Sequence, residues 1–285
     1  MSTYQLLDSG DGRKLEKIGD YVLIRPAPQA IWQPFSPELW SQAHSEFLKE
    51  KGEKGIWRPR NLPEGVKKNQ AGRGVPDSWT VVSPSKIKYA VEPNDYGNIG
   101  IFPEHWLYSQ DLVSLLPKKP KVLNVFTYTG SSCLDLVKAG AEVTVVDSTK
   151  SAINTYVHNL EANGFSRQGQ RLILEDAMKF LEREKRRNSK YDCVMIDAPS
   201  YGRGTKGEIF DLEKELIRLL ELSNTLCAED GTIIFTLHSP RYTQAALEQV
   251  VRQMFSSRKD ILVQELKLPA KSDSYLTAGI LIQIH

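Results

Sequence analysis

Along residues 118–285 the hydrophobic residues gather in short aliphatic runs, and longer amphipathic stretches separate these runs. The stretches predict helices over about residues 131–139, 150–162, 176–187, 208–227 and 241–256. Strands that alternate with helices are typical of a parallel sheet covered by helices on both faces, so an α/β domain is predicted here. The runs predict strands at Val122–Phe126, Glu142–Asp147, Arg171–Leu174, Tyr191–Asp197, Thr232–Leu237, Ile261–Leu266 and Leu276–Gln283.

The pattern up to residue 112 consists of short strands and loops instead. Ser36 followed by Pro37 is typical of a helix start, so we expect a helix that runs to Leu48. Residues 49–76 are predicted to be a long loop with eight Lys or Arg residues against three Glu. We therefore divide the chain into a small β-rich region, residues 1–112, and an α/β domain, residues 113–285. Strands of the first region are predicted at Tyr4–Leu7, Tyr21–Ile24, Trp79–Val82 and Ile87–Val91.

The net charge, the cysteine content and the apolar stretches of the sequence exclude some classes of protein but do not identify the function. The 285 residues carry a formal net charge of +2, so a nucleic-acid partner would require locally concentrated positive charge. Three scattered cysteines predict neither a disulfide framework nor a metal site, and reduced thiols favour a cytoplasmic protein. The sequence shows no apolar leader and no long apolar stretch, so we expect no membrane association.

The ends of the predicted strands carry the residues with the clearest chemical meaning. Gly130 follows the first strand of the α/β domain, in a turn that lets the backbone approach a ligand closely. Asp147 ends the second strand, where a carboxylate can bind the ribose hydroxyls of an adenosine. Asp176 follows the third strand and can bind an adenine amino group. For both acids the alternative is a cap of the next helix.

The sequence Asp197-Ala198-Pro199-Ser200-Tyr201-Gly202 closes the fourth strand. Ligands of open α/β sheets bind beyond the carboxyl ends of the strands, and all four strand-end sites fall there. A G-x-G-x-x-G turn is absent, which disfavours a dinucleotide site and a nicotinamide oxidoreductase. These observations predict one nucleoside-binding edge of the sheet.

Five stretches within residues 85–285 match a known pattern: Gly97–Trp106, Leu123–Gly130, Val145–Ser148, Glu175–Ala177 and Asp197–Gly204. With them the sequence resembles class I S-adenosylmethionine-dependent methyltransferases. Within that class it is similar to the bacterial large-subunit (23S) ribosomal RNA cytosine-C5 methyltransferases. The resemblance implies a Rossmann-like seven-stranded sheet with the order 3-2-1-4-5-7-6 and an antiparallel seventh strand. It also implies S-adenosylmethionine as the cofactor and residues 113–285 as the methyltransferase domain.

The resemblance further implies roles for individual residues. The methionine part of the cofactor would be lined by Asn124, Thr127, Thr129 and Gly130, and covered by Phe102. The ribose would be held by Asp147 and Ser148, and the adenine by Asp176 and Ala177. The transferred methyl group and its acceptor would face Asp197, Pro199, Ser200 and Tyr201 as catalytic residues, with no metal ion involved.

The sequence departs from the cytosine-C5 pattern at the catalytic cysteine. Pyrimidine C5 methylation requires a thiolate that adds to C6. In the resembled family that cysteine lies just after the fifth strand, where this sequence reads Phe235-Thr236-Leu237-His238-Ser239-Pro240. In another RNA methyltransferase group it lies beside an Asp-Ala-Pro motif, which here reads Asp197-Ala198-Pro199-Ser200, and neither place contains cysteine. Direct transfer to an RNA nitrogen or hydroxyl is therefore expected, with Asp197 and the Pro199 carbonyl positioning the acceptor and Tyr201 stacking on a base. His238 is a candidate base, although a polar residue at a strand end needs no such role.

RNA, in particular large-subunit ribosomal RNA, is the expected partner. The basic loop 49–76 with Trp57 suits an RNA backbone and one stacked base, which makes residues 1–112 a candidate substrate-recognition region. Arg203–Gly207 is a second basic loop beside the acceptor site, whereas the basic run in helix 176–187 is more typical of a solvated face. Two alternatives stay open: a methyltransferase of a protein side chain or small molecule, and a non-catalytic assembly factor that binds RNA or the cofactor.

Overall fold

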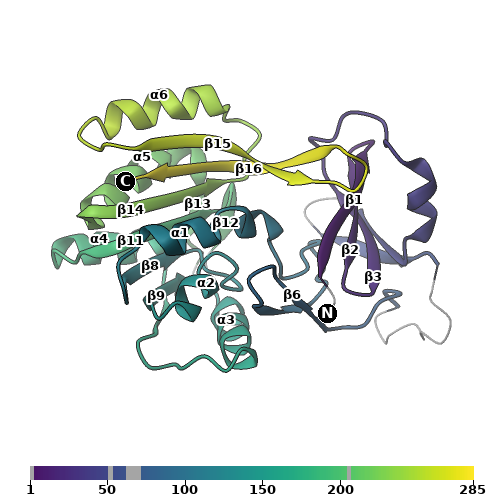
Figure 1. The fold of residues 1–285 in the computed structure, drawn as a ribbon, viewed down its shortest axis with the longest axis horizontal. Coiled ribbons are helices and arrows are strands. Elements are labelled where there is room, and N and C mark those ends of the chain that lie inside the picture. Colours follow the sequence, from purple (N-terminus) through teal and green to yellow (C-terminus); the bar gives the residue numbers. More distant parts are fainter. Residues whose placement is uncertain (1–2, 51–53, 62–71, 204–206) are drawn as a thin grey trace. The chain divides into compact units, whose positions relative to one another are not determined.

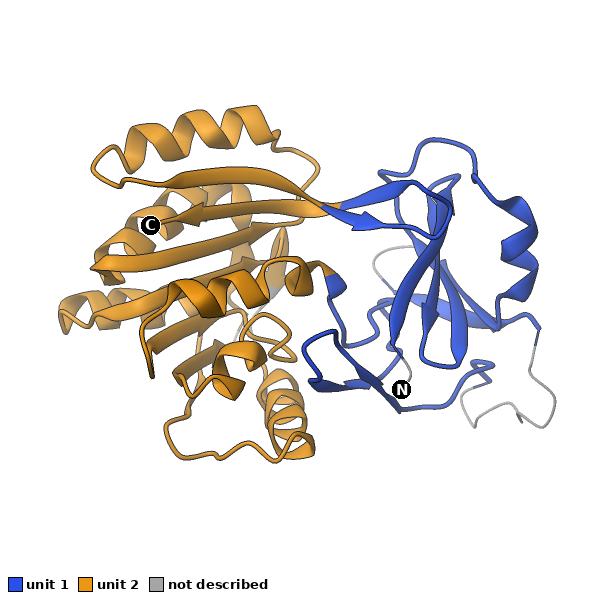
Figure 2. Cartoon of the chain, viewed as in Figure 1, with its two compact units in different colours: residues 1–103, 267–277 blue, residues 104–266, 278–285 orange. Residues whose placement is uncertain are grey.

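A computed structural model describes residues 3–50, 54–61, 72–203 and 207–285 of the chain. The chain forms two compact units (Figures 1 and 2). Unit 1 contains residues 1–103 and 267–277, and unit 2 contains residues 104–266 and 278–285. This division differs from the predicted boundary after residue 112, because a segment near the C-terminus joins unit 1. None of the helices in the described ranges combines the length and the apolar character that a membrane span requires.

Unit 1 is built on a five-stranded sheet with the order β1-β2-β3-β4-β5. Its apolar core contains Leu7, Leu15 and Ile24, which are buried against Leu39 and Trp40. Ala270, from the C-terminal segment of this unit, forms a bridge with Leu6. The strands are β1 (Tyr4–Gly10), β2 (Arg13–Ile18), β3 (Tyr21–Pro26), β4 (Ser45–Lys49) and β5 (Gly55–Pro59), followed by the separate antiparallel pair β6 (Trp79–Val82) and β7 (Lys88–Val91).

The helix predicted from Ser36 to Leu48 is wrong. The structure has a short 3₁₀ helix η1 (Pro37–Gln42) followed by strand β4. Ser36 makes no side-chain cap, and its backbone N–H instead donates to Asp8 Oδ2 at 2.9 Å. The prediction fails because strand pairing of Ser45–Lys49 with β3 and β5 outweighs the local helix signal.

The loop predicted over residues 49–76 is also wrong in part, because β5 lies within it. Trp57 on β5 is buried among the residues of unit 1, and its Nε1 donates to the carbonyl of Asn94 at 2.8 Å. Its ring packs edge-on against Phe47. Trp57 therefore belongs to the core and is not available to stack on an RNA base. Lys51, Lys67 and Lys68 of the basic loop lie outside the described residues.

Unit 2 contains a seven-stranded sheet with the order β10-β9-β8-β11-β14-β16-β15, which reads 3-2-1-4-5-7-6 when the strands are counted within the sheet (Figure 1). The first five strands pair in parallel, and β16 pairs antiparallel with β14. The prediction of an α/β domain with a Rossmann-like sheet is confirmed. The strands are β8 (Lys121–Val125), β9 (Glu142–Asp147), β10 (Arg171–Leu174), β11 (Tyr191–Ala198), β14 (Cys227–Leu237), β15 (Ile261–Pro269) and β16 (Tyr275–Ile284).

Helices cover both faces of this sheet, as expected for strands that are buried on both sides. One apolar core joins side chains of α4, α5 and α6, such as Phe180, Leu219 and Val251, to the sheet. The helices α1 to α3 lie over the opposite face (Figure 1). Preceded by the 3₁₀ turn η2 (Pro103–Leu107), the helices are α1 (Ser109–Leu115), α2 (Leu134–Lys138), α3 (Lys150–Ala162), α4 (Ala177–Arg186), α5 (Leu212–Leu226) and α6 (Gln244–Met254).

The helix predicted over residues 208–227 begins later than expected. Strand β12 (Tyr201–Arg203) pairs with β13 (Ile209–Asp211) in a small hairpin, and α5 starts only at Leu212. Asp211 caps α5 by accepting from the backbone N–H of Glu213 at 3.2 Å. The basic loop predicted at Arg203–Gly207 connects these two strands, and its residues 204–206 lie outside the described ranges.

Candidate active site

The loop after β8 contains four of the predicted cofactor residues. Asn124 is fully buried, and its Nδ2 donates to Ser132 Oγ at 2.9 Å. The hydroxyl of Thr127 donates to the Asn124 carbonyl at 2.8 Å, and Thr129 is buried as well. Asn124 Oδ1 and Thr129 Oγ1 have no hydrogen-bond partner among the described residues. Two buried oxygens without a partner are costly and are more often found where a ligand or water completes the site.

The backbone of this loop adopts a conformation that few residues tolerate. Phe126, Tyr128 and Gly130 have φ values of 60°, 45° and 80°, in the left-handed region. A Cβ atom on Gly130 would lie 2.5 Å from Cδ2 of Tyr156, a buried residue of α3. Asn159, on the same face of α3, donates to the carbonyl of Thr129 at 2.9 Å. Tyr156 and Asn159 of α3 therefore pack against this loop and fix its backbone. Residues in the left-handed region are strained, and such strain is concentrated at ligand sites.

Asp147 lies at the carboxyl end of β9, next to this loop. Its Oδ2 accepts from the backbone N–H of Tyr128 at 3.1 Å, and its Oδ1 accepts from the backbone N–H and hydroxyl of Thr149, both at 3.0 Å. Burial raises the pKa of Asp147, although these hydrogen bonds partly offset the effect. The alternative of Asp147 as a helix cap is wrong, because Thr149 caps α3. Asp147 instead ties the β9 end to the β8 loop.

Asp176 caps helix α4, which is the alternative to an adenine contact that the sequence left open. Its Oδ1 accepts from the backbone N–H of Lys179 at the start of α4 at 3.0 Å, and Ala177 beside it is buried. A cap engages one carboxylate oxygen, so this contact and an adenine contact are compatible. Asp176 also lines an open hollow of about 770 Å³ between α4, β13 and α5, together with Met178 and Phe210. Ser148 is half-buried after the β9 end.

Asp197 forms the most strongly coupled cluster of unit 2. Its Oδ1 accepts from the hydroxyl of Thr236 and lies 3.0 Å from Nε2 of His238, both on or just after β14. Its Oδ2 lies 3.3 Å from Nε2 of His105, a buried residue of η2. Nδ1 of His238 lies 2.8 Å from the carbonyl of Ala278 on β16. Residues of β11, β14 and η2 therefore meet at this carboxylate, and β16 contacts the His238 ring.

The charges of this cluster shift the protonation equilibria strongly. Burial raises the pKa of Asp197, but His105 and His238 outweigh it and hold this pKa well below its usual range. Burial lowers the pKa of His238, yet the Asp197 carboxylate and Glu104 raise it to about 9. Burial together with Asp197 and Glu104 raises the pKa of Tyr108 well above its usual value. Asp197 is thus an ionised carboxylate at neutral pH.

The other predicted acceptor-side residues follow Asp197 directly. Pro199 is half-buried and Ser200 is exposed, with the Ser200 carbonyl accepting from the Leu212 N–H at 3.2 Å. The side chain of Tyr201 is 45% exposed on β12, so it is not the packed loop aromatic of the alternative reading. An exposed aromatic ring beside Asp197 in sequence is available to stack on a planar group.

All three cysteines are buried and make no disulfide. Cys133 precedes α2, Cys193 lies inside β11, and Cys227 lies at the start of β14. Burial raises the pKa of each thiol. A thiol with a raised pKa in an apolar environment is a poor nucleophile.

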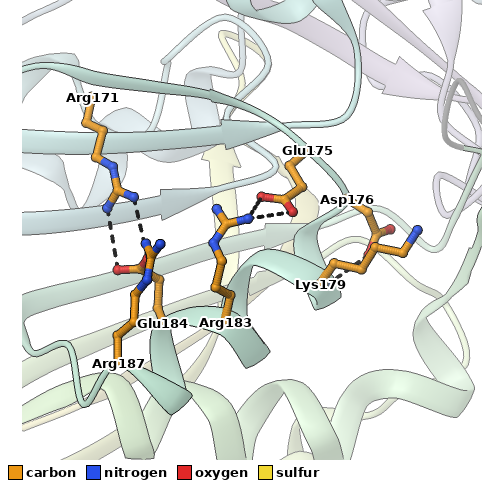
Figure 3. Close-up of polar contacts among 7 residues, drawn as sticks. All are labelled: Arg171, Glu175, Asp176, Lys179, Arg183, Glu184 and Arg187. Atoms are coloured by element: carbon orange, nitrogen blue, oxygen red, sulfur yellow. Dashed lines mark hydrogen bonds and ion pairs between the residues drawn. The ribbon is translucent and has the colours of Figure 1, made fainter.

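Two arginines of the basic run at the end of α4 pair with acidic neighbours (Figure 3). Arg183 Nη1 donates to Glu175 at 2.7 Å, and Arg187 binds Glu184 at 3.0 Å. Glu184 is buried and also accepts from Arg171, which lies at the start of β10. Lys185, Arg186 and Arg187 are exposed, so the interpretation of this run as a solvated face is confirmed.

Three of the basic residues in the loop predicted over 49–76 have contacts of their own. Arg60 lies 3.4 Å from Glu46, and Arg73 lies 3.2 Å from Asp95. Lys54 stands over the ring of Tyr96. Phe102, predicted to cover the cofactor, is half-buried and belongs to unit 1, so its role stays a prediction.

Several residues of the site escaped the sequence-based prediction. His105 and Glu104 lie in a stretch that matched the family pattern, but neither had a separate chemical signal there. Tyr156 and Asn159 are spaced i, i+3 on one face of α3, which is a usable signal for two side chains directed at one loop. Thr236 precedes the strand end and looks like an ordinary β-strand residue.

The geometry fits a sulfonium nucleoside at the carboxyl ends of β8 and β9. The end of β8 and the loop after it contain Gly130, where a side chain would not fit, and the buried oxygens of Asn124 and Thr129 that lack a hydrogen-bond partner among the described residues. The Asp147 carboxylate lies at the end of β9 and accepts from the backbone of that loop. Among the described residues, the nitrogen and oxygen atoms of His105, Asp197 and His238 also lie within 4.8 Å of one another. This spacing is also compatible with a metal ion, so the expectation that no metal takes part stays a prediction.

Comparison with known proteins gives consistent results. A family profile described as RNA cap guanine-N2 methyltransferase matches residues 119–278. The ribosomal RNA large subunit methyltransferase K/L of Stutzerimonas stutzeri is 30% identical over 188 residues, which are 65% of this chain and 25% of that protein. The chain therefore spans about a quarter of the length of this curated relative.

Two solved structures extend the likeness to the whole chain. The SAM-dependent methyltransferase of Agrobacterium tumefaciens is 30% identical, with a TM-score of 0.88, and the match covers 100% of this chain and 91% of that one. SMU.776, solved in complex with SAH, is 20% identical with a TM-score of 0.75, covering 100% of this chain and 76% of that one. At this lower identity the likeness concerns the fold alone.

Proposed function

We propose that this chain, which belongs to the RNA cap guanine-N2 methyltransferase family, methylates a nitrogen of an RNA base by direct transfer from S-adenosylmethionine. The observation that carries the proposal is the Asp197 cluster at the strand edge that also holds the Gly130 loop and Asp147. An ionised carboxylate followed by an exposed tyrosine suits a planar base with an amino group. The prediction that the chain is a class I S-adenosylmethionine-dependent methyltransferase is confirmed.

The cofactor of this enzyme is S-adenosylmethionine. When bound, it supplies an electrophilic methyl group on a sulfonium centre. The loop of Asn124, Thr127, Thr129 and Gly130 would hold its methionine part, because this loop presents buried oxygens that lack a partner. Asp147 with Ser148 would hold the ribose, and Asp176 with Ala177 the adenine. Both acids keep carboxylate lone pairs beyond their present contacts.

Asp197, Pro199 and Tyr201 would position the amino group that accepts the methyl group, without forming a covalent bond to the base. Asp197 can accept an N–H of the acceptor, and the Pro199 carbonyl can accept a second one. Tyr201 would stack on the base, which restricts the approach of the amine to one plane. Holding a lone pair in line with the methyl group is the main catalytic requirement of such a transfer.

The proposal leaves out a cysteine adduct, in contrast to the cytosine-C5 branch that the sequence resembles. The three cysteines are buried with raised pKa values, and none of them contacts Asp197 in the described hydrogen-bond network. The description of the matching family names a guanine amino nitrogen, which supports a nitrogen acceptor. The name of the Stutzerimonas stutzeri relative supports large-subunit ribosomal RNA as the carrier of the base.

The experiment is a transfer assay with radiolabelled S-adenosylmethionine and RNA from cells that lack this chain, followed by mass mapping of the ribosomal RNA. We expect label in large-subunit RNA on a purine amino group. Tyr201→Ala should raise KM for RNA while leaving the affinity for the cofactor unchanged. Tyr275→Ala, which removes a comparably exposed tyrosine, is the matched control.

Each other outcome points to a specific alternative. Label only in protein or in small molecules would replace the RNA assignment. Binding of the cofactor without any transfer would support a non-catalytic assembly factor. Label at C5 of a cytosine would overturn direct transfer, because that position requires a thiolate.

A further inference from the structure

Both ring nitrogens of His238 face hydrogen-bond acceptors. Nδ1 lies 2.8 Å from the backbone carbonyl of Ala278, and Nε2 lies 3.0 Å from Oδ1 of Asp197. A carbonyl oxygen has no proton to donate, and an ionised carboxylate has none either. A neutral imidazole carries one N–H and one bare nitrogen, so it would leave one of these contacts without a proton. The geometry is satisfied only when both nitrogens are protonated.

We propose that His238 is a positioning residue, held as an imidazolium, which keeps Asp197 ionised and in a fixed orientation for the acceptor amine. This inference rests on the proposed function and deepens it. It also excludes the role of His238 as the base that removes the acceptor's proton. A doubly protonated ring has no lone pair to receive that proton.

The surroundings of His238 support a fixed cation. The Asp197 carboxylate of β11 lies beside its Nε2 and also accepts from the Thr236 hydroxyl of β14, while β16 contributes the carbonyl of Ala278 and the backbone of Gly279. The turn η2 contributes His105, whose ring centroid lies 6.5 Å from that of His238, and the buried Glu104. Tyr108, which follows η2, is buried and packs edge-on against His105. The Asp197 carboxylate contacts the His238 ring and the negative charge of Glu104 adds to its effect, so the local charges favour the protonated form.

The cluster also decides which oxygen of Asp197 can serve the substrate. Oδ1 already accepts from Thr236 and His238, which uses its two lone pairs. Oδ2 faces His105 at 3.3 Å and keeps one further lone pair. The acceptor amine is therefore expected to donate to Oδ2. A residue at position 238 that donates only one hydrogen bond would let the carboxylate turn.

The direct test is nuclear magnetic resonance of protein with ¹⁵N-labelled histidine, because it reports protonation without any turnover. The chain has five histidines, and His238→Gln assigns the signal of interest by its loss. We expect one ring with both nitrogens protonated at neutral pH, and this state should persist until the pH approaches about 9. His158→Gln, at an exposed histidine of α3, is the matched control and should remove a different histidine signal while leaving that of His238 in place.

The kinetic test separates positioning from a merely structural role. In His238→Gln the acidic limb of the kcat/KM profile should move up by about one pH unit or more, because Asp197 loses its cation. KM for S-adenosylmethionine should stay within about twofold. A purely structural residue would reduce the amount of folded enzyme and leave the limb in place.

Two results would overturn the inference. A single protonated nitrogen on His238 at neutral pH would show a neutral ring, whether or not the enzyme methylates RNA. A joint shift of the His105 and His238 signals on addition of Zn²⁺ at stoichiometric amounts would show that the cluster binds a metal ion instead. Failure of methyl transfer with the imidazolium signal intact would affect the proposed function alone.

Discussion

Each unit of the protein holds a carboxylate among several cationic partners, Glu16 in unit 1 and Asp197 in unit 2, and the two differ in burial and in the kind of partner. Glu16 of unit 1 is fully buried, and Arg25 binds both of its oxygens at 2.7 and 2.9 Å, with Lys14 at 3.1 Å. Asp197 of unit 2 keeps 17% of its side chain exposed, and its cationic partners are histidines. A guanidinium stays charged at every accessible pH, whereas an imidazole does not.

We expect this difference to distinguish an ion pair that only stabilises the fold from one that also takes part in the proposed reaction. The Glu16 side chain itself has no exposed surface for a ligand, and Arg25, Lys14 and Tyr4 all contact its carboxylate. Arg25 also donates to the carbonyl of Gly97, which ties β3 to a later loop of unit 1. The Asp197 cluster keeps solvent access and a lone pair, at the strand edge where α/β sheets bind ligands. Burial and strong charge coupling alone therefore do not identify an active site.

The largest expected effect comes from Asp197→Asn. The neutral amide keeps the shape of the side chain but loses the charge that receives the acceptor N–H. We expect kcat/KM for RNA to fall by about 10²–10⁴-fold, measured by methyl transfer at saturating cofactor. Asp230→Asn, an exposed acid on β14, is the control and should leave the rate unchanged. An unaffected rate in Asp197→Asn would remove this carboxylate from the mechanism.

The corresponding change in unit 1 should act on stability instead. Glu16→Gln leaves Arg25 and Lys14 without their carboxylate, and an uncompensated buried charge costs about 3–5 kcal/mol. Chemical denaturation should show this loss in the free energy of unfolding, while Glu38→Gln on the exposed surface of η1 changes little. If Glu16→Gln unfolds like the wild type, the pair is not the structural element that its burial indicates.

The pH dependence of the free energy of unfolding should show the Glu16 cluster at acidic pH and the Asp197–His238 cluster at alkaline pH. Burial raises the pKa of Glu16, but Arg25 and Lys14 lower it from 4.5 to about 2. The pair's stabilisation is therefore complete above pH 4.5 and is lost as the pH falls through about 2. For His238 the pKa is raised from 6.5 to about 9, so its stabilisation is complete below pH 6.5 and is lost as the pH rises through about 9.

Unfolding curves of Glu16→Gln and His238→Gln across pH measure these windows. Each variant should lack one limb of the wild-type dependence and keep the other. Loss of the alkaline limb in Glu16→Gln would contradict this assignment of the two limbs.

A smaller effect is expected from Asp147→Ala, which should weaken S-adenosylmethionine binding by about 1.5–3 kcal/mol for each charge-assisted hydrogen bond lost. Isothermal calorimetry measures it directly. Because Asp147 also holds the backbone of Tyr128, part of the loss reflects a looser β8 loop. Thr149→Ala removes one contact of Asp147 and keeps the carboxylate, so it should cost less. Equal affinity in Asp147→Ala and the wild type would show that the ribose assignment is wrong.

The sequence by itself determined the α/β half of the protein and indicated the sheet edge at which we propose that the cofactor binds. Aliphatic runs that alternate with amphipathic helices predict the strands of unit 2, because both signals are local and periodic. The strand-end residues Gly130, Asp147 and Asp197 follow from that pattern, since parallel strands end at one edge. Local signals failed where two states compete, as in residues 36–48, where pairing with two strands overrides a helix start.

Only the tertiary structure decided how the charges are arranged. His105 and His238 lie on segments far apart in the chain, and nothing in their spacing indicates that both meet Asp197. Trp57 looks like an exposed aromatic in a basic loop, yet strand pairing buries it. The physical reason is the same in both cases. Protonation and burial depend on which groups lie within a few ångströms, and chain folding sets those distances between residues that are remote in sequence.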